Sequence, residues 1–582
     1  MANRKAPKDG LKKQIDPASE AWNKIPWRKL EHHVYRIQKR IYQARQRGNE
    51  RTVQKLQKLL MKSEAARLLA VRRVTQENQG KKTAGVDGVK NVLPKQRLVL
   101  AETIHPKHWK DQKPKPVRRV WIPKPGKTEK RPLGIPVMLE RAKQALVKIS
   151  LEPEWEAVFE ANSYGFRPGR SCQDAIEAIY NNIRYKQKFV LDADIKGCFD
   201  NINQEALLKK LQTFTTMRHV IKAWLKAGVL DGVEFAPTEA GTPQGGVISP
   251  LLANIALHGL EEAIKEGYSK NRNVEKPTLI RYADDFVVLH SEKEAIEKAA
   301  KVAEEWLEDM GLHLNTKKTK VTHTFTPYEG NVGFDFLGFT VRQFPMGKTH
   351  RIKNTNGKPL EFKAIIEPSK EAIKRHQGEI GKRIRALRGA PQEKLIKELT
   401  PIIRGWANYY RTSAASTAYA ERDHVMHQQL LSWGKYRHSK KGIGWVINKY
   451  WPNVNSTHHD WTFAASETMK LRRHRETTII RPYAKVKGNA SPYDGNLLYW
   501  SQRLRTHPMM KQRLAKLLQK QQGKCRWCEL TFRDGDKIEI DHIDGNHNND
   551  HPSNLVALHL HCHDEKHRPS ATWVHAASVT NK

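Results

Sequence analysis

The spacing of apolar residues predicts helices at the start of the chain. Between residues 34 and 75 apolar side chains recur every three or four positions, as they do along one face of an amphipathic helix, with a break near Gly48. Lys and Arg occupy many of the positions between them. We therefore expect a helical hairpin with a basic outer surface.

The middle of the chain alternates between the periods of strands and helices. Residues 117–122 and 189–195 read as strands, and residues 279–289 read as a hairpin that turns at Ala283 and Asp284. The longest uncharged run, 240–260, contains Pro, Gln and Asn, so it predicts a buried loop, strand and helix rather than a membrane span. This part of the chain predicts an α+β domain.

The remainder is predicted to be mainly helical from 368 to 432. An aromatic, basic stretch then runs to residue 499 and predicts no regular element. A final helix over 506–521 leads into a segment that holds three of the five cysteines.

Composition narrows the class of protein. A chain of 582 residues exceeds what one core supports, so several domains are expected. The net charge of +42 is spread along the whole length among Trp and Tyr residues, which indicates a nucleic-acid partner rather than a membrane anchor or a basic tail.

The cysteines and the first residues indicate the compartment. Five cysteines, most of them in the last sixty residues, do not suit a disulfide framework. Residues 1–16 are basic and have no apolar core, so we expect no secretion signal and no membrane association. A reducing cytosol is the expected location.

Three aspartates are the strongest candidates for catalysis. Asp194 ends a predicted strand, and Asp284 and Asp285 occupy the turn of the predicted hairpin. Extension of a nucleic-acid chain uses two Mg²⁺ ions held by carboxylates from separate strands. Paired aspartates at a turn are usually only a solvated turn, but the carboxylate on a second strand favours the catalytic interpretation.

Four further residues are candidates for binding a nucleotide. An aromatic ring at Phe199 would lie beneath the sugar and disfavour a 2′-hydroxyl, which selects dNTPs. Gln244 lies in a glycine-rich turn where backbone can approach a ligand closely. Lys124 and Arg131 flank a tight turn and suit a triphosphate, although a single basic residue is more often simply on the surface.

An ordered series of motifs runs through the first 340 residues. The motifs are the segments RPLGIP at 131–136, SYGFRP at 163–168, DIKGCFD at 194–200, PQGG at 243–246, YADD at 282–285 and FLGF at 336–339, with Gly311, Leu312, Lys318 and Thr319 between the last two. This series resembles the successive blocks of a reverse transcriptase encoded by a bacterial group II intron. The segment RGWANYY at 404–410 is similar to the thumb, or maturase, domain of that family.

The resemblance implies roles for individual residues. It implies Mg²⁺ at Asp194, Asp284 and Asp285, and nucleotide contacts from Lys124, Arg131, Phe199, Gln244 and Lys318. It implies that the protein binds its own intron RNA, to which Arg404, Trp406 and Tyr409 would contribute. It also implies a DNA-binding region over 435–499, where Arg472, Arg473 and Arg475 would contact phosphates of the target DNA.

The C-terminal cysteines predict a structural zinc site. Cys525 and Cys528 form one ligand pair, and His559 and Cys562 form a second pair about thirty residues later. His561 competes with His559, but the spacing favours His559 because two residues then separate the ligands, as in the first pair. A zinc knuckle without catalysis is the simpler alternative.

The residues between and beside these pairs resemble an HNH endonuclease motif. The resemblance implies that His542 is the general base, that Asn554 orients the loop carrying it, and that Asp541 and His563 hold one divalent ion, Mg²⁺.

The expected architecture is therefore multidomain α+β. It comprises an N-terminal basic helical segment (1–95), right-hand reverse transcriptase fingers and palm (96–345), a helical thumb or maturase X domain (346–432), a DNA-binding region (433–515) and a zinc-containing ββα-metal HNH endonuclease (516–582).

The expected function is RNA-directed DNA synthesis with dNTPs, maturase activity on the intron RNA, and nicking of target DNA to prime reverse transcription. Two alternatives stay open, a splicing factor whose polymerase has lapsed and a reverse transcriptase of defence or retron type. The intact aspartates disfavour the first, and the thumb and HNH motifs disfavour the second.

Overall fold

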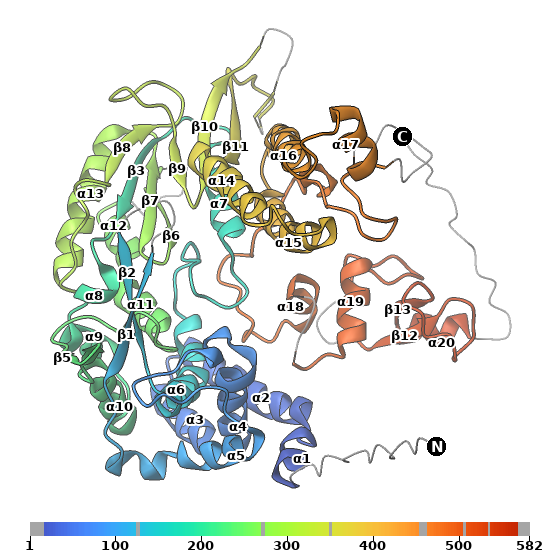
Figure 1. The fold of residues 1–582 in the computed structure, drawn as a ribbon. Coiled ribbons are helices and arrows are strands. Elements are labelled where there is room, and N and C mark those ends of the chain that lie inside the picture. Colours follow the sequence, from blue (N-terminus) through green and yellow to red (C-terminus); the bar gives the residue numbers. More distant parts are fainter. Residues whose placement is uncertain are drawn as a thin grey trace, which may run out of the picture.

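The computed structural model resolves an N-terminal helical layer, a palm built on a β-sheet, a helical thumb and a small C-terminal module (Figure 1). It describes residues 17–123, 129–268, 274–347, 352–354, 356–452, 462–504, 508–532 and 536–567. Lys124 and the segment 1–16, about which the sequence made predictions, lie outside these residues.

The N-terminal segment is helical, as the apolar spacing predicted, but it contains more helices than a hairpin. The break falls at residues 47–49, where Gly48 takes φ 68°. Buried apolar side chains of this layer join the core beneath the palm. The helices are α1 (Pro17–Asn23), α2 (Trp27–Gln46), α3 (Glu50–Lys62), α4 (Glu64–Arg72), α5 (Pro94–Thr103) and α6 (Met138–Glu156), with a π-helical turn at Arg73–Glu77 and 3₁₀ turns at Gln79–Lys82 and Pro106–Asp111.

The palm is a four-stranded sheet in the order β6-β7-β3-β8. The predicted strand at 189–195 becomes β3, and the predicted hairpin at 279–289 becomes β6 and β7. All neighbouring strands of this sheet run antiparallel. The strands are β3 (Phe189–Asp194), β6 (Thr278–Tyr282), β7 (Asp285–His290) and β8 (Lys320–His323), and the surrounding helices are α7 (Cys172–Ile183), α8 (Cys198–Asn201), α9 (Gln204–Leu211), α10 (Thr215–Leu225), α11 (Ser249–Leu257), α12 (Leu260–Lys265) and α13 (Lys293–Glu308).

Two further sheets flank the palm. One has the order β2-β1-β4-β5 and the other has the order β11-β10-β9. Their strands are β1 (Val117–Pro123), β2 (Lys130–Ile135), β4 (Val229–Asp231) and β5 (Glu234–Ala236), and β9 (Phe334–Phe336), β10 (Phe339–Pro345) and β11 (Phe362–Pro368).

The predicted strand within 240–260 is wrong. Residues 241–248 form turns, and α11 and the start of α12 follow. The carbonyl of Gln244 accepts a hydrogen bond from the Gly134 N–H at 2.6 Å, and Gly245 takes φ 114°. The turn therefore presents its backbone to the fingers and leaves no extended run for a strand.

The C-terminal half is mainly helical, as predicted, with two differences. The last helix begins at Gln512 rather than at 506, because the backbone of Lys511, the residue before it, is extended. A further helix, α18 (Leu497–Leu504), lies in the stretch for which no element was predicted. The remaining elements are α14 (Lys370–Ala386), α15 (Gln392–Tyr410), α16 (Ser416–Arg437), α17 (Ile443–Tyr450), a 3₁₀ turn at His474–Glu476, α19 (Gln512–Lys520), β12 (Ile538–His542), β13 (Leu555–His559) and α20 (Leu560–Lys566).

The segment that follows the thumb packs into the palm core. Trp500 and Val486 are buried in the same apolar cluster as Tyr164 of the palm, and an added Cβ on Gly169 would lie 2.4 Å from the Trp500 ring. None of the helices in the described parts of the chain is long and apolar enough to cross a membrane.

A buried carboxylate fastens this segment to the palm. Asp174, in the first turn of α7, is fully buried and pairs with the Arg503 guanidinium. It also accepts hydrogen bonds from the Val486 N–H at 2.7 Å and the Ser171 hydroxyl at 2.8 Å. The Asp174 carboxylate therefore caps the N-terminus of α7 and also binds Val486 and Arg503, which lie far from it in the sequence.

Replacing Asp174 should destabilise the protein strongly. We expect Asp174→Ala to lower the free energy of unfolding by about 3–5 kcal/mol, because it removes a fully buried carboxylate and leaves the partly buried Arg503 guanidinium without its ion-pair partner. Urea denaturation followed by tryptophan fluorescence measures the change. The control is Glu305→Ala, whose ion pair with Lys301 is 3.9 Å long and solvent-exposed and should cost under about 0.5 kcal/mol. Equal denaturation midpoints for Asp174→Ala and wild type would contradict this role.

Candidate active sites

The three predicted aspartates meet at one end of the palm sheet. Asp194 is the last residue of β3 and Asp285 is the first of β7, and the two are directly paired across the strands. Asp284 lies in the turn between β6 and β7. The structure therefore brings together the carboxylates that the sequence placed on separate strands.

Burial and neighbouring charges raise the pKa of two of these carboxylates. Burial, followed by the charges of Asp284 and Asp194, raises the pKa of Asp285 to about 7. Burial and the Asp194 charge also raise the pKa of Asp284. Asp192, which the sequence analysis did not select, has its pKa raised to about 7 by burial and by Asp335. Carboxylate oxygens gathered in this way fit divalent cations such as Mg²⁺, whose charge offsets the repulsion.

Contacts from remote segments fix the turn that carries Asp284. Ala283 takes φ 60°, an uncommon conformation for a residue with a Cβ. The buried Arg281 guanidinium donates to the Ala283 carbonyl and to the Asn254 side chain, each at 3.1 Å. Asn254 in turn donates to the Gly165 carbonyl at 2.8 Å. The sequence analysis missed these positioning roles because the contacts join segments far apart in the chain.

Phe199 and Gln244 border one pocket. It has a volume of about 210 Å³, and Arg119 and Asp200 also line it.

Two basic residues act on the same carboxylates. The Lys318 ammonium lies 2.8 Å from Asp194, and the Asn315 side chain donates to the same carboxylate at 3.0 Å. The charge of Arg131 opposes the rise in the pKa of Asp284. Of the predicted nucleotide-binding residues, Phe199 and Gln244 therefore share a pocket, and Lys318 contacts a predicted metal ligand.

The predicted nucleic-acid contacts of the thumb and the segment after it differ in exposure. Arg404 is exposed on α15, whereas Trp406 stacks on His376 at 4.5 Å and Tyr409 donates to the Leu337 carbonyl at 2.8 Å. Arg472 donates to the Thr477 hydroxyl and Arg473 pairs with Glu476. Arg475 pairs with Asp423 at 3.7 Å, so five of these six side chains also have partners inside the protein.

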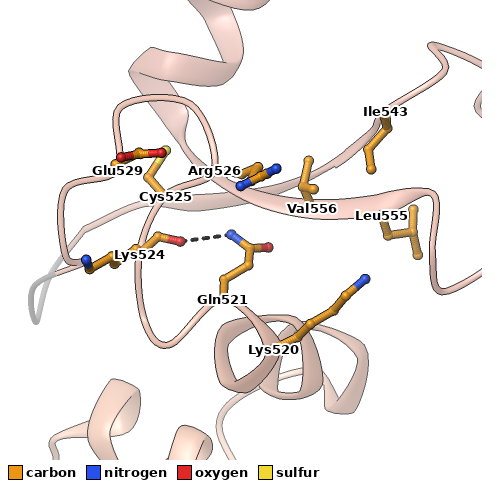
Figure 2. A pocket seen from close by; sticks show the side chains of 9 residues that line it. All are labelled: Lys520, Gln521, Lys524, Cys525, Arg526, Glu529, Ile543, Leu555 and Val556. Carbon is orange, nitrogen blue, oxygen red and sulfur yellow. Dashed lines mark hydrogen bonds between the residues drawn. The ribbon is translucent and has the colours of Figure 1, made fainter. Parts of the chain in front are cut away.

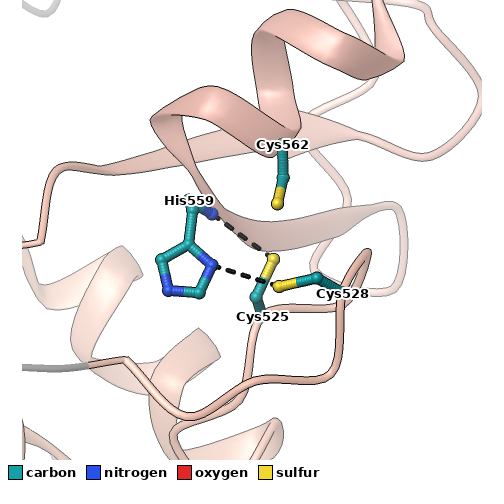
Figure 3. A group of neighbouring side chains, drawn as sticks. All are labelled: Cys525, Cys528, His559 and Cys562. Carbon is teal, nitrogen blue, oxygen red and sulfur yellow. Dashed lines mark hydrogen bonds between the residues drawn. The ribbon is translucent and has the colours of Figure 1, made fainter.

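The C-terminal cysteines and one histidine form a compact cluster (Figure 3). The ligand atoms of Cys525, Cys528, His559 and Cys562 all lie within 4.8 Å of one another. His559 Nδ1 faces Cys528 at 3.4 Å, and its Nε2 lies 3.3 Å from Asp536. A Cys₃His set with a carboxylate behind the histidine fits structural zinc.

The fold settles which histidine belongs to this cluster. His559 ends β13 and points into the cluster, whereas His561 is exposed on α20 and stacks on His559 at 5.0 Å. Gln521 connects α19 to the cysteine-bearing turn and to β13. Its side chain donates to the Lys524 carbonyl at 2.8 Å (Figure 2) and to the Ala557 carbonyl at 2.9 Å. A cavity of about 390 Å³ lies on this side of the hairpin, and none of the predicted nuclease residues lines it.

The predicted nuclease residues lie at the β12–β13 hairpin. Asp541 and His542 end β12, and Asp541 gathers with His563 and His567 into a second set that could hold a metal ion. Asn554 donates to Asp544 at 2.8 Å and accepts from its N–H at 3.1 Å, which fixes the loop after His542. The structure thus brings Asp541 and His563 together and places Asn554 beside the loop that follows His542.

Two residues of this site were missed. Lys566 contacts Asp541 and the His542 carbonyl, and His567 lies 3.0 Å from Asp541. Although burial acts in the opposite direction, hydrogen bonds from these two side chains hold the pKa of Asp541 below its ordinary value. His567 follows His563 by one helical turn, and that spacing was the available signal.

Models of known protein families match the regions of the chain that hold the two sites. Residues 122–341 match the model of reverse transcriptase (RNA-dependent DNA polymerase), and residues 22–104 match its N-terminal domain. Residues 373–451 match the group II intron, maturase-specific domain, and residues 525–569 match HNH endonuclease.

Several curated proteins are similar over parts of the chain. Protein YkfC of Escherichia coli is 32% identical over 325 residues, which cover 49% of this chain and 82% of that protein. Group II intron-encoded protein LtrA of Lactococcus lactis is 39% identical over 194 residues, which cover 33% of this chain and 32% of LtrA. The aligned region therefore spans about a third of LtrA.

The fold and the two sites define a reverse transcriptase that also carries an HNH endonuclease domain. With its maturase-specific domain, the chain belongs to the family of group II intron-encoded proteins.

Substitution of Gly165 should displace the catalytic turn. An added Cβ would lie 2.3 Å from the Ala283 backbone nitrogen, so the turn that carries Asp284 must move. We expect Gly165→Ala to slow primer extension by about 100-fold, since small misplacements at a reacting centre are costly. The control is Gly389→Ala, whose Cβ meets nothing within 4 Å and should leave the rate unchanged. Equal extension rates for the two variants would refute the close contact.

Proposed function

We propose that this protein copies RNA into DNA, assists the splicing of its own intron RNA, and nicks a DNA target to provide the primer. The observation that supports this most is the direct pairing of Asp194 with Asp285 beside Asp284, on a chain that also holds the Asp541 and His542 arrangement. The partners would be the intron RNA, the target DNA and dNTPs. We place the protein in a bacterial cytoplasm.

The polymerase site would work through charge and position. Two Mg²⁺ ions on Asp194, Asp284 and Asp285 would supply activation of the primer hydroxyl and neutralisation of the triphosphate. Arg131 and Lys318 bring positive charge to the triphosphate, and Lys124 would add to it. Phe199, beside Gln244 in the pocket, would disfavour a 2′-hydroxyl on the incoming nucleotide.

The nuclease site would use His542 as the base that accepts a proton from water. Asn554 holds the loop next to His542, and Asp541 with His563 and His567 would hold one Mg²⁺ ion, which supplies stabilisation of the leaving oxygen. Zinc on the Cys₃His cluster would stabilise the small module around this site.

Loss of one palm carboxylate should separate copying from splicing. We expect Asp284→Ala to reduce Mg²⁺-dependent extension of a DNA primer on an RNA template by a factor of about 100 or more, while splicing of the intron RNA proceeds as with wild type. Gel analysis of extension with dNTPs or NTPs measures the first activity. Asp309→Ala, an exposed carboxylate at the end of α13, serves as the control. Full extension by Asp284→Ala would refute the assigned site.

Two variants of the C-terminal module should separate catalysis from structure. We expect His542→Ala to lower DNA nicking by about 100- to 10,000-fold with the zinc content unchanged. Cys528→Ala should lose the zinc, measured by atomic emission, and with it the hydrogen-exchange protection of β12 and β13. Primer extension should survive both changes. Nicking by His542→Ala at the wild-type rate would show that another group is the base.

A further inference from the structure

Two exposed aromatic rings flank a basic loop at the outer end of the thumb. Tyr436 is 64% exposed near the end of α16, and Trp445 is 39% exposed on α17. Among the Tyr and Trp side chains that the structure describes, only Trp121 reaches a similar exposure, at 48%. Two large rings left open within ten residues of each other indicate a surface that meets a partner.

Cationic side chains lie over both rings. The Arg388 guanidinium is 4.8 Å from the centre of the Tyr436 ring. The ammonium groups of Lys449 and Lys441 are 4.9 Å and 5.6 Å from the Trp445 ring. An aromatic face beside a cation suits a ligand that has both a flat ring and negative charge.

The charge around these rings is entirely positive over a long stretch. Residues 424–459 contain no Asp or Glu. Lys435, Lys440, Lys441 and Lys449 are exposed, and none of them takes part in an ion pair found among the described residues. Desolvation and the nearby Lys449, Arg437 and Lys441 lower the pKa of His438. An anionic partner would offset this unbalanced charge.

The protein core holds Trp445 in place. His438 contacts the Tyr450 hydroxyl at 2.8 Å and meets the Trp445 ring edge-on at 4.7 Å. Tyr450 is buried against Trp433 at 5.0 Å. The exposed indole is therefore backed by a fixed aromatic core, which limits the entropy lost when a ligand stacks on it.

We propose that Tyr436, Trp445 and the basic loop 438–442 bind single-stranded nucleic acid, with unpaired bases stacked on the rings and phosphates near the lysines. A duplex hides its base faces, so exposed rings favour an unpaired strand over a paired one. The inference rests on the proposed function only in taking nucleic acid as the ligand. α17 lies beyond α16 from the palm sheet, so this surface is separate from the polymerase site (Figure 1).

Photo-crosslinking of the full chain tests direct contact. Single-stranded RNA and DNA oligonucleotides of one sequence, each carrying 5-bromouracil or 5-bromouridine, are irradiated with the protein, and crosslinked peptides are identified by mass spectrometry. We expect crosslinks at Tyr436 or Trp445 that a matched duplex does not give. Preference for the RNA strand points to intron RNA, and preference for the DNA strand points to the target. Crosslinks elsewhere but none at these rings would overturn the proposal.

Ring variants test the energy of stacking. We expect Tyr436→Ala and Trp445→Ala each to weaken single-strand binding by about tenfold and to leave duplex binding unchanged, whereas Tyr436→Phe and Trp445→Phe bind within about threefold of wild type. The double variant Lys440→Ala and Lys441→Ala should reduce the slope of the logarithm of the binding constant against the logarithm of the salt concentration by about 1.4. Equal loss for single and double strands, or wild-type binding by both Ala variants, would overturn the proposal.

Primer extension on a preformed template and primer separates this inference from the proposed function. Intact extension without crosslinks at the rings would reject the stacking surface alone. Crosslinks at the rings in a protein that cannot extend a primer would reject the polymerase assignment alone.

Discussion

Repulsion among carboxylates at the end of the palm sheet is the constraint on which the rest of the structure depends. Asp194, Asp284 and Asp285 are held together, although burial and repulsion from neighbouring carboxylates disfavour the charged forms of Asp284 and Asp285. The fold opposes that repulsion with the Lys318 ammonium at 2.8 Å and with the hydrogen bonds of the turn. The palm therefore acts as a frame that keeps like charges together at one end of the sheet.

The frame is built from segments that are distant in the chain. Gly165 comes from the loop before α7, Asn254 from α11 and Arg281 from β6, and together they support Ala283. Each lies beneath the turn and none is expected to touch the nucleotide. Their arrangement explains why a buried arginine is retained in the core, since it satisfies a carbonyl in a turn with an uncommon backbone conformation.

The sequence predicted those features that depend on local periodicity. The alternation of residues 189–194 and 279–289 was enough to place Asp194 and Asp285 at strand ends, and the spacing of Cys525 and Cys528 was enough to indicate a metal ligand pair. Which of the two histidines, His559 or His561, joins the cysteine cluster depends on where β13 ends. Contacts such as Arg281 with Asn254 depend on how elements pack, which no local pattern encodes. The strand expected within 240–260 failed for the same reason, because the turn at Gln244 is shaped by its contact with Gly134.

The packing of Trp500 against Gly169 bears on how the domains of such a protein can be gained or lost. Val486 and Trp500 complete the apolar core of the palm, and Arg503 neutralises a buried carboxylate there. The segment between thumb and nuclease is thus structurally part of the polymerase. A lineage that sheds the nuclease at a point beyond α18 keeps an intact palm, whereas a deletion that reaches back to Val486 opens the core to water. Modularity in this chain has its natural boundary after Leu504 rather than at the end of the thumb.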